Sequence, residues 1–78
     1  MAIETNADVA RRVRGLAAEK QVKQSALAAA IHVSRMAMWR RMTGETPISA
    51  EELIVFARVI GVPVAAFYVE STIEAVAS

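Results

Sequence analysis

Basic side chains are the residues with the clearest potential for chemistry in this 78-residue sequence, and they are concentrated in one stretch of it. Residues 9–44 contain eight Lys and Arg residues and a single acid, Glu19, which gives this stretch a net charge of +7. Residues 1–8 carry −2 and residues 45–78 carry −4, so the net charge of the chain is only +1. Such an asymmetry attracts phosphate groups to one part of a small molecule. It indicates a polyanionic partner, and a solvated basic face without a partner is the alternative interpretation.

The residue types needed for catalysis and metal binding are scarce. The sequence has one histidine, His32, and no cysteine, and no pair of carboxylates is placed opposite a predicted pocket. The lack of cysteine also fits a reducing compartment. Charges interrupt the apolar runs well before the roughly 20 residues that span a bilayer, and the N-terminus lacks the layout of a signal peptide. We therefore expect a cytoplasmic protein that is not an enzyme, has no metal, cofactor or small-molecule substrate, and does not bind membranes.

The spacing of apolar residues predicts an all-α fold, a compact bundle of about five short helices in a single domain of residues 1–78. The predicted helices lie near residues 6–20, 24–31, 35–43, 50–60 and 63–68. The first helix is expected to have Thr5 or Asn6 as its N-cap. The clearest boundary is the capping box of Ser49 and Glu52 at the start of the fourth helix.

The second and third predicted helices are joined by three residues, 32–34, and Ser34 is placed to cap the third helix. This layout lets one helix enter the major groove of DNA while its neighbour braces it. The residues that form the pattern of this region are Gln24, Leu27, Ala28, Ile31, Val33, Ser34, Met38, Arg40, Met42 and Gly44. This pattern resembles that of the Cro and phage-repressor helix-turn-helix family, also called XRE-like.

The resemblance covers roughly residues 9–68 and implies a lambda-repressor-like DNA-binding domain. Two positions depart from the family pattern. His32 stands where glycine is usual in the turn, and a non-glycine residue enters a left-handed backbone conformation only at an energetic cost. Lys23 stands where a capping Ser or Thr is usual.

By this resemblance, the base-reading side chains lie on the exposed face and early turns of the third helix: Arg35, Met36, Trp39 and Arg40. Arg35 is suited to a bidentate contact with guanine, although an exposed arginine can also be merely solvated. Met36 has no hydrogen-bonding role and would touch a thymine methyl or pack. Trp39 lies four residues after Arg35, on the same helical face. The alternative interpretation is that Trp39 packs in the core.

The same resemblance implies contacts to the DNA backbone, which supply affinity without sequence preference. The side chains predicted to make them are Lys23, Gln24, Ser34, Arg41 and Thr43, together with Arg11, Arg12 and Arg14 of the first helix. Ser34 has two interpretations, as an N-cap and as a phosphate contact, and the two are compatible.

The function that the resemblance implies is sequence-specific binding to a double-stranded DNA operator and repression of transcription, in the manner of a Cro-type phage or prophage protein. We expect a homodimer through residues 67–73, because one recognition helix covers few base pairs and this apolar segment is not needed by the motif. Residues 69–78 are compatible with an extended, dimerising or frayed tail. The alternative function is a helical protein-interaction module that binds an acidic partner protein.

Overall fold

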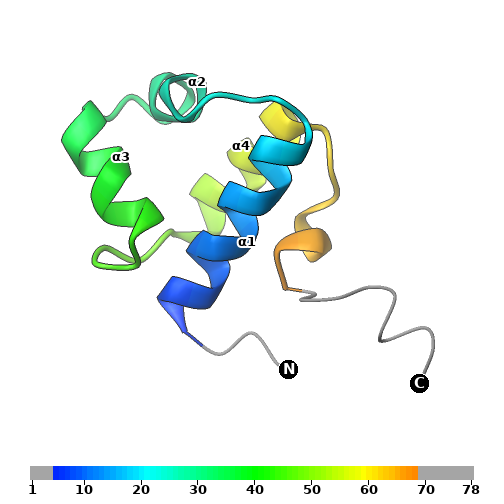
Figure 1. Cartoon of the computed structure of the whole chain (residues 1–78), viewed down its shortest axis with the longest axis horizontal. Coiled ribbons are helices and arrows are strands. Elements are labelled where there is room, and N and C mark those ends of the chain that lie inside the picture. Colours follow the sequence, from blue (N-terminus) through cyan, green and yellow to red (C-terminus); the bar gives the residue numbers. More distant parts are fainter. Residues whose placement is uncertain (1–4, 69–78) are drawn as a thin grey trace.

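Four α-helices and one 3₁₀-helix make up residues 5–68, the part of the chain that the computed structural model describes (Figure 1). The elements are α1 (Asn6–Glu19), α2 (Gln24–Ala30), α3 (Arg35–Met42), α4 (Ala50–Ile60) and η1 (Val64–Tyr68). The predicted all-α fold class is confirmed, and each predicted helix is present within two residues of its expected bounds. The fifth element is a short 3₁₀-helix.

Side chains at the N-termini explain where three of the helices begin. The hydroxyl of Thr5 accepts a hydrogen bond from the Asp8 N–H, and the Asp8 carboxylate accepts one from the Thr5 N–H, which forms a capping box for α1. Ser49 and Glu52 form the predicted capping box of α4. Ser34 caps α3 by accepting from the Ala37 N–H. Lys23 precedes α2 without a side-chain cap.

Left-handed residues close the helices at their other ends. His32 follows α2 with φ 58°, its N–H donates to the Ala29 carbonyl, and the Val33 N–H donates to the Ala28 carbonyl. This pair of hydrogen bonds is a Schellman motif, which normally places glycine at the left-handed position. Gln21 occupies the same position after α1, with φ 59°. His32 therefore adopts the left-handed conformation that glycine normally has in this motif.

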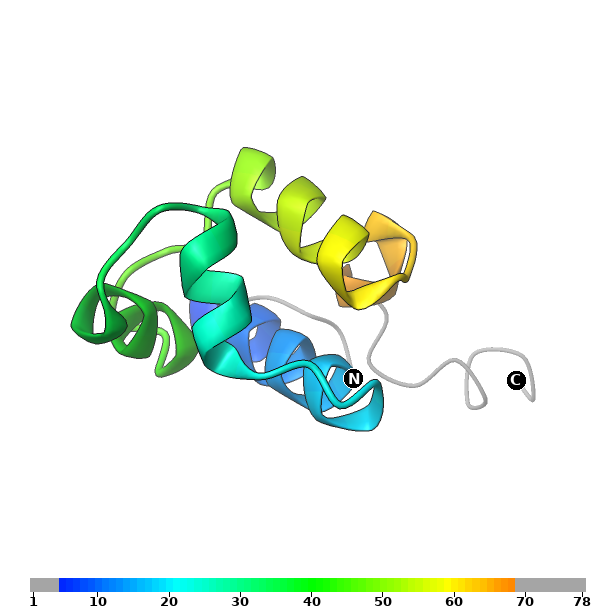
Figure 2. The same cartoon turned by 90° about the horizontal axis from the view of Figure 1, so that it is seen from above.

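The core lies between α1 and α4, and α2, α3 and η1 cover it (Figures 1 and 2). Helix α1 contacts α3, α4 and η1, whereas α2 packs against α3 and α4. The largest fully buried side chains are Phe56, Phe67, Leu27, Met38, Leu53 and Val13. Since these come from all five elements, α2 and α3 are fixed on the rest of the domain by a common apolar core.

The predicted dimer segment, residues 67–73, is only partly within the described chain. Phe67 is fully buried among the core residues, so its side chain is not available to a second subunit. Tyr68 is half exposed at the end of η1. The tail of residues 69–78 lies outside the described residues. Within residues 5–68, no helix combines the length and apolar character needed to cross a membrane.

Candidate nucleic-acid interface

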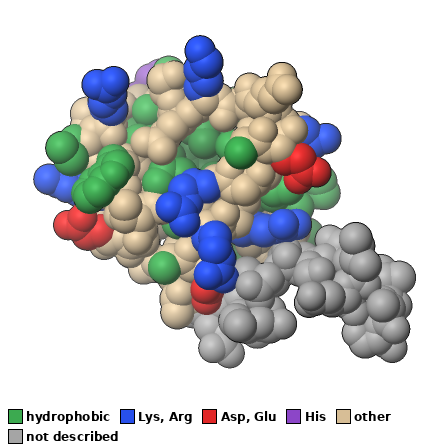
Figure 3. Space-filling model, viewed as in Figure 1, with side chains coloured by type: hydrophobic (Ala, Val, Ile, Leu, Met, Phe, Trp, Pro, Cys, Tyr) green, Lys and Arg blue, Asp and Glu red, His purple; other side chains and the backbone are tan. Residues whose placement is uncertain are grey.

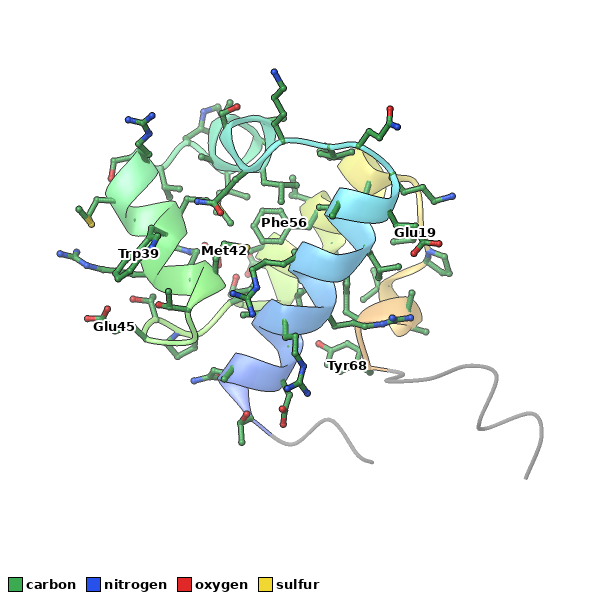
Figure 4. All side chains as sticks on the ribbon, in the orientation of Figure 1. Glu19, Trp39, Met42, Glu45, Phe56 and Tyr68 are labelled. Atoms are coloured by element: carbon green, nitrogen blue, oxygen red, sulfur yellow. The ribbon has the colours of Figure 1, made fainter. Side chains whose placement is uncertain are left out.

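Helix α3 has one buried face and one exposed face. Met38 and Met42, four residues apart, are buried in the core. The four predicted base-reading residues, Arg35, Met36, Trp39 and Arg40, are all exposed. Trp39 keeps 52% of its surface exposed and lies on the outside of α3, whereas Met42 and Phe56 point to the interior (Figure 4). The sequence left Trp39 either on the exposed face of the helix or in the core. The interpretation that it packs in the core is wrong.

A hollow of about 350 Å³ lies on this exposed face and brings residues of two helices together. It is lined by Gln24 at the start of α2 and by Arg35, Met36 and Trp39 of α3. Hydrophobic side chains reach the surface over α3 with basic side chains on either side (Figure 3). The interface thus combines apolar surface with positive charge. The hollow contains three of the four predicted base-reading residues.

A second depression lies between exposed parts of α2 and α3 and continues the same face. Its volume is about 520 Å³, and Lys23, Gln24, Ser25 and Arg35 are among its lining residues. Ala28 and Ala29 also line it. Gln24 and Arg35 line both hollows, so they stand where the two meet.

The two hydroxyl groups at the ends of α3 differ in their capacity for further hydrogen bonds. The Ser34 hydroxyl accepts from the Ala37 N–H at 3.0 Å, which leaves its own proton available to an external acceptor. The Thr43 hydroxyl donates to the Arg40 carbonyl at 3.1 Å. Thr43 must give up this bond before it can donate to a phosphate. Of the two, Ser34 is the better prepared to contact DNA while it caps the helix.

Two of the arginines that were predicted to contact the DNA backbone instead make contacts within the protein. Arg41 pairs with Glu52 of α4 through its Nε and Nη2 atoms, and its Nη1 donates to the Ala37 carbonyl at 3.0 Å. The Arg41 side chain is only 16% exposed. Arg12 donates from Nε to the carbonyl oxygen of Ala66 in η1 at 2.9 Å. Both guanidinium groups therefore have partners inside the domain, which their positions in the sequence do not reveal.

The other cations that were predicted to contact the DNA backbone lie at the protein surface. Lys23 and Arg14 are exposed, as are Arg35 and Arg40, and these four make no ion pair within residues 5–68. Arg11 is also exposed and forms an ion pair with Asp8 at 3.0 Å. Arg14 lines a third, smaller depression together with Gln24 and Met42, so α1 contributes charge next to the hollows of α2 and α3.

The pKa of the Glu52 carboxyl is lowered from its ordinary value of 4.5. Partial burial alone would raise this pKa, but hydrogen bonds from Arg41 and from the Ser49 N–H, together with the charge of Arg41, outweigh it. Glu52 is therefore a carboxylate at neutral pH and keeps its charged partner on α3.

A short helix, a tight left-handed turn and a capped second helix with an exposed basic face define the helix-turn-helix class. The family described as "Helix-turn-helix domain" matches residues 8–67 of this chain. The chain therefore belongs to the helix-turn-helix domain family. The matched range is almost the same as the range of the XRE-like resemblance found in the sequence. No curated protein and no solved structure gives a significant match.

Proposed function

We propose that this protein binds double-stranded DNA in a sequence-specific manner and represses transcription by occupying an operator, as a Cro-type protein does. The observation that carries the proposal is the exposed face of α3, where Arg35 and Arg40 flank the apolar Met36 and Trp39. Met38 and Met42 anchor α3 in the shared core and leave the four side chains of this face at the surface. Such a helix has the dimensions to enter the major groove.

Base recognition is assigned to the four exposed residues of α3. Arg35, the first residue of the helix, is placed for a bidentate contact with guanine O6 and N7. Arg40 lies five residues further along and contacts a second base or the adjacent phosphate. Met36 and Trp39 contribute apolar contacts, which in the major groove are made to the thymine methyl group.

Phosphate contacts are assigned to the exposed polar side chains around α3: Lys23, Gln24, Ser34, Thr43, Arg11 and Arg14. These contacts position the domain without selecting a sequence. Arg12 and Arg41 add to the positive field of the same region, although their engaged N–H groups make them mainly structural.

We further propose that the protein acts in the cytoplasm as a homodimer on two half-sites roughly 34 Å apart. Two linked recognition helices multiply affinity, because the second binding event becomes intramolecular. Since Phe67 belongs to the core, we assign the dimer contact to residues 68–73, beginning with the exposed Tyr68.

A fluorescence anisotropy titration of a random duplex at two salt concentrations tests the proposal. A DNA-binding protein binds the random duplex weakly and loses affinity steeply as the salt concentration rises. The reason is that its binding releases cations from the phosphates, and this release is less favourable at high salt. Selection from a random duplex pool then gives the operator and its half-site spacing, and transcription from a promoter containing that operator should fall when the protein is added. A protein that ignores duplex DNA at low salt would contradict the proposal and favour the alternative, an acidic partner protein that binds Trp39 and its basic surroundings.

A further inference from the structure

The hollow lined by Gln24, Arg35, Met36 and Trp39 combines two kinds of chemistry in one small space. Arg35 offers a planar fork of N–H donors. Met36 and Trp39, which are 57% and 52% exposed, offer apolar surface three residues apart on the same helix. They are the two most exposed large apolar side chains within residues 5–68. Apolar surface beside a guanidinium group is complementary to a ligand that has an apolar group next to hydrogen-bond acceptors.

The edges of base pairs in the major groove meet this requirement at one kind of step. Guanine presents two acceptors, N7 and O6, which match the arginine fork. The C5-methyl group of thymine is the only apolar group that the four bases display there. A guanine stacked next to a pyrimidine with a C5-methyl group therefore presents acceptors and a methyl side by side.

We propose that this hollow recognises a C5-methylated pyrimidine adjacent to a guanine. Arg35 contacts guanine N7 and O6, and the methyl group of the neighbouring pyrimidine enters the apolar part of the hollow between Met36 and Trp39. In unmodified DNA the pyrimidine is thymine. The 5-methyl group of 5-methylcytosine has the same position and is recognised in the same way. The inference rests on the proposed function and adds the chemical feature that the site selects.

The experiment removes the methyl group from the DNA and leaves the rest of the duplex unchanged. In the operator obtained by selection, each thymine is replaced in turn by deoxyuridine, which lacks only the C5-methyl group. We expect the affinity of the full chain to fall about fourfold at one thymine per half-site, next to the guanine whose replacement is most damaging, as the burial of a methyl group predicts. At the same position, 5-methylcytosine should bind more tightly than cytosine by a similar factor, about fourfold.

Variants of the protein assign the effect to the hollow. Met36→Gln and Trp39→Gln should bind the thymine and deoxyuridine duplexes equally. Both side chains are exposed, so these variants should fold, and circular dichroism checks that they do. Ile54→Gln is the matched control, because Ile54 is an exposed apolar residue on α4 outside the hollow. It should keep the preference for the methyl group.

The outcomes separate this inference from the proposed function. Equal affinity for thymine and deoxyuridine duplexes at every position, with sequence-specific binding intact, would overturn the methyl recognition and leave the function standing. A methyl preference that survives in both Met36→Gln and Trp39→Gln would also overturn it. A chain that binds no duplex at all would overturn both.

Discussion

Arg41 of α3 and Glu52 of α4 form a two-point ion pair, in which Nε donates to Oε1 and Nη2 donates to Oε2, each at 3.1 Å. The Glu52 Oε1 atom also accepts a hydrogen bond from the Ser49 N–H, which completes the capping box of α4. One carboxylate therefore both starts α4 and fixes the helix that carries the proposed base contacts. The stability of the α4 N-terminus and the orientation of α3 are consequently linked.

The first prediction separates the two roles of Glu52. Glu52→Gln keeps an acceptor suited to a capping box but removes the charge, so it should lower the free energy of unfolding by about 1 kcal/mol. Glu52→Ala also removes the cap and should cost about 2 kcal/mol in total. Urea unfolding followed by circular dichroism measures both values. Equal stability of the wild-type chain and the Gln variant would show that the ion pair contributes nothing.

The second prediction concerns pH. The pKa of Glu52 is lower in the folded chain than its ordinary value of 4.5. The stabilisation from its ionised form is therefore complete above the unfolded pKa and is lost as the pH falls through the folded pKa. As the pH falls from neutral through the folded-state pKa of Glu52, the wild-type chain should lose more stability than Glu52→Gln, because the variant lacks this titration. Thermal unfolding at several pH values measures the difference, and parallel losses in the two proteins would refute the role of Glu52.

Local signals in the sequence predicted most of the fold. Capping side chains act within a few residues, so the cap of Ser34 and the capping box of Ser49 and Glu52 could be placed without a structure, and Thr5 was one of two candidates for the cap of α1. Gln21 was missed as a left-handed residue because its side chain gives no such signal.

Contacts between distant segments could not be predicted in this way. Arg12 and its acceptor, the carbonyl of Ala66, are 54 residues apart, and Arg41 and Glu52 lie on different helices. Their spacing follows from how the helices pack, and not from any local pattern. Trp39 shows the same limit, because its spacing fits either the exposed face or the core and only the packing of α3 decides.

The third prediction tests the two roles assigned to cations. Arg35→Ala should weaken binding to the selected operator by about 1 to 3 kcal/mol and relax the preference for guanine at one position. Arg14→Ala, at an exposed position on α1, should weaken all duplexes alike and reduce the salt slope by about 1. Parallel titrations of the operator and a random duplex measure both effects. If the two variants lost operator and random binding to the same extent, the division into base and backbone contacts would be wrong.

The fourth prediction concerns the left-handed residue of the helix-turn-helix turn. His32 is exposed and has φ 58°, so its replacement by glycine relieves backbone strain without removing core contacts. The greater entropy of glycine in the unfolded chain offsets part of this gain. We expect His32→Gly to stabilise the domain by about 0.5 kcal/mol and to raise the melting temperature by about 2 to 4 °C. Ala29→Gly, inside α2, is the control and should lower the melting temperature. A fall in both variants would show that His32 is not strained.

The fifth prediction uses two glycines with nearly the same backbone but different surroundings. Gly44 and Gly61 have φ 85° and 84°, so alanine is strained at both positions. A Cβ atom at Gly61 would meet nothing within 4 Å, whereas one at Gly44 would lie 2.8 Å from the Cα and 3.0 Å from the N of Ala7 in α1. Because those are backbone atoms, relief requires α1 or the end of α3 to move.

We therefore expect Gly61→Ala to cost about 1 kcal/mol of stability and Gly44→Ala to cost roughly 2 kcal/mol or more. Urea unfolding of the two variants measures the difference, which reports the contact between the α3 turn and the first turn of α1. Since the displaced segment follows α3 directly, Gly44→Ala should also reduce operator affinity at temperatures where it remains folded, and Gly61→Ala should not. Equal costs in the two variants would mean that α1 moves without cost and does not fix the end of α3.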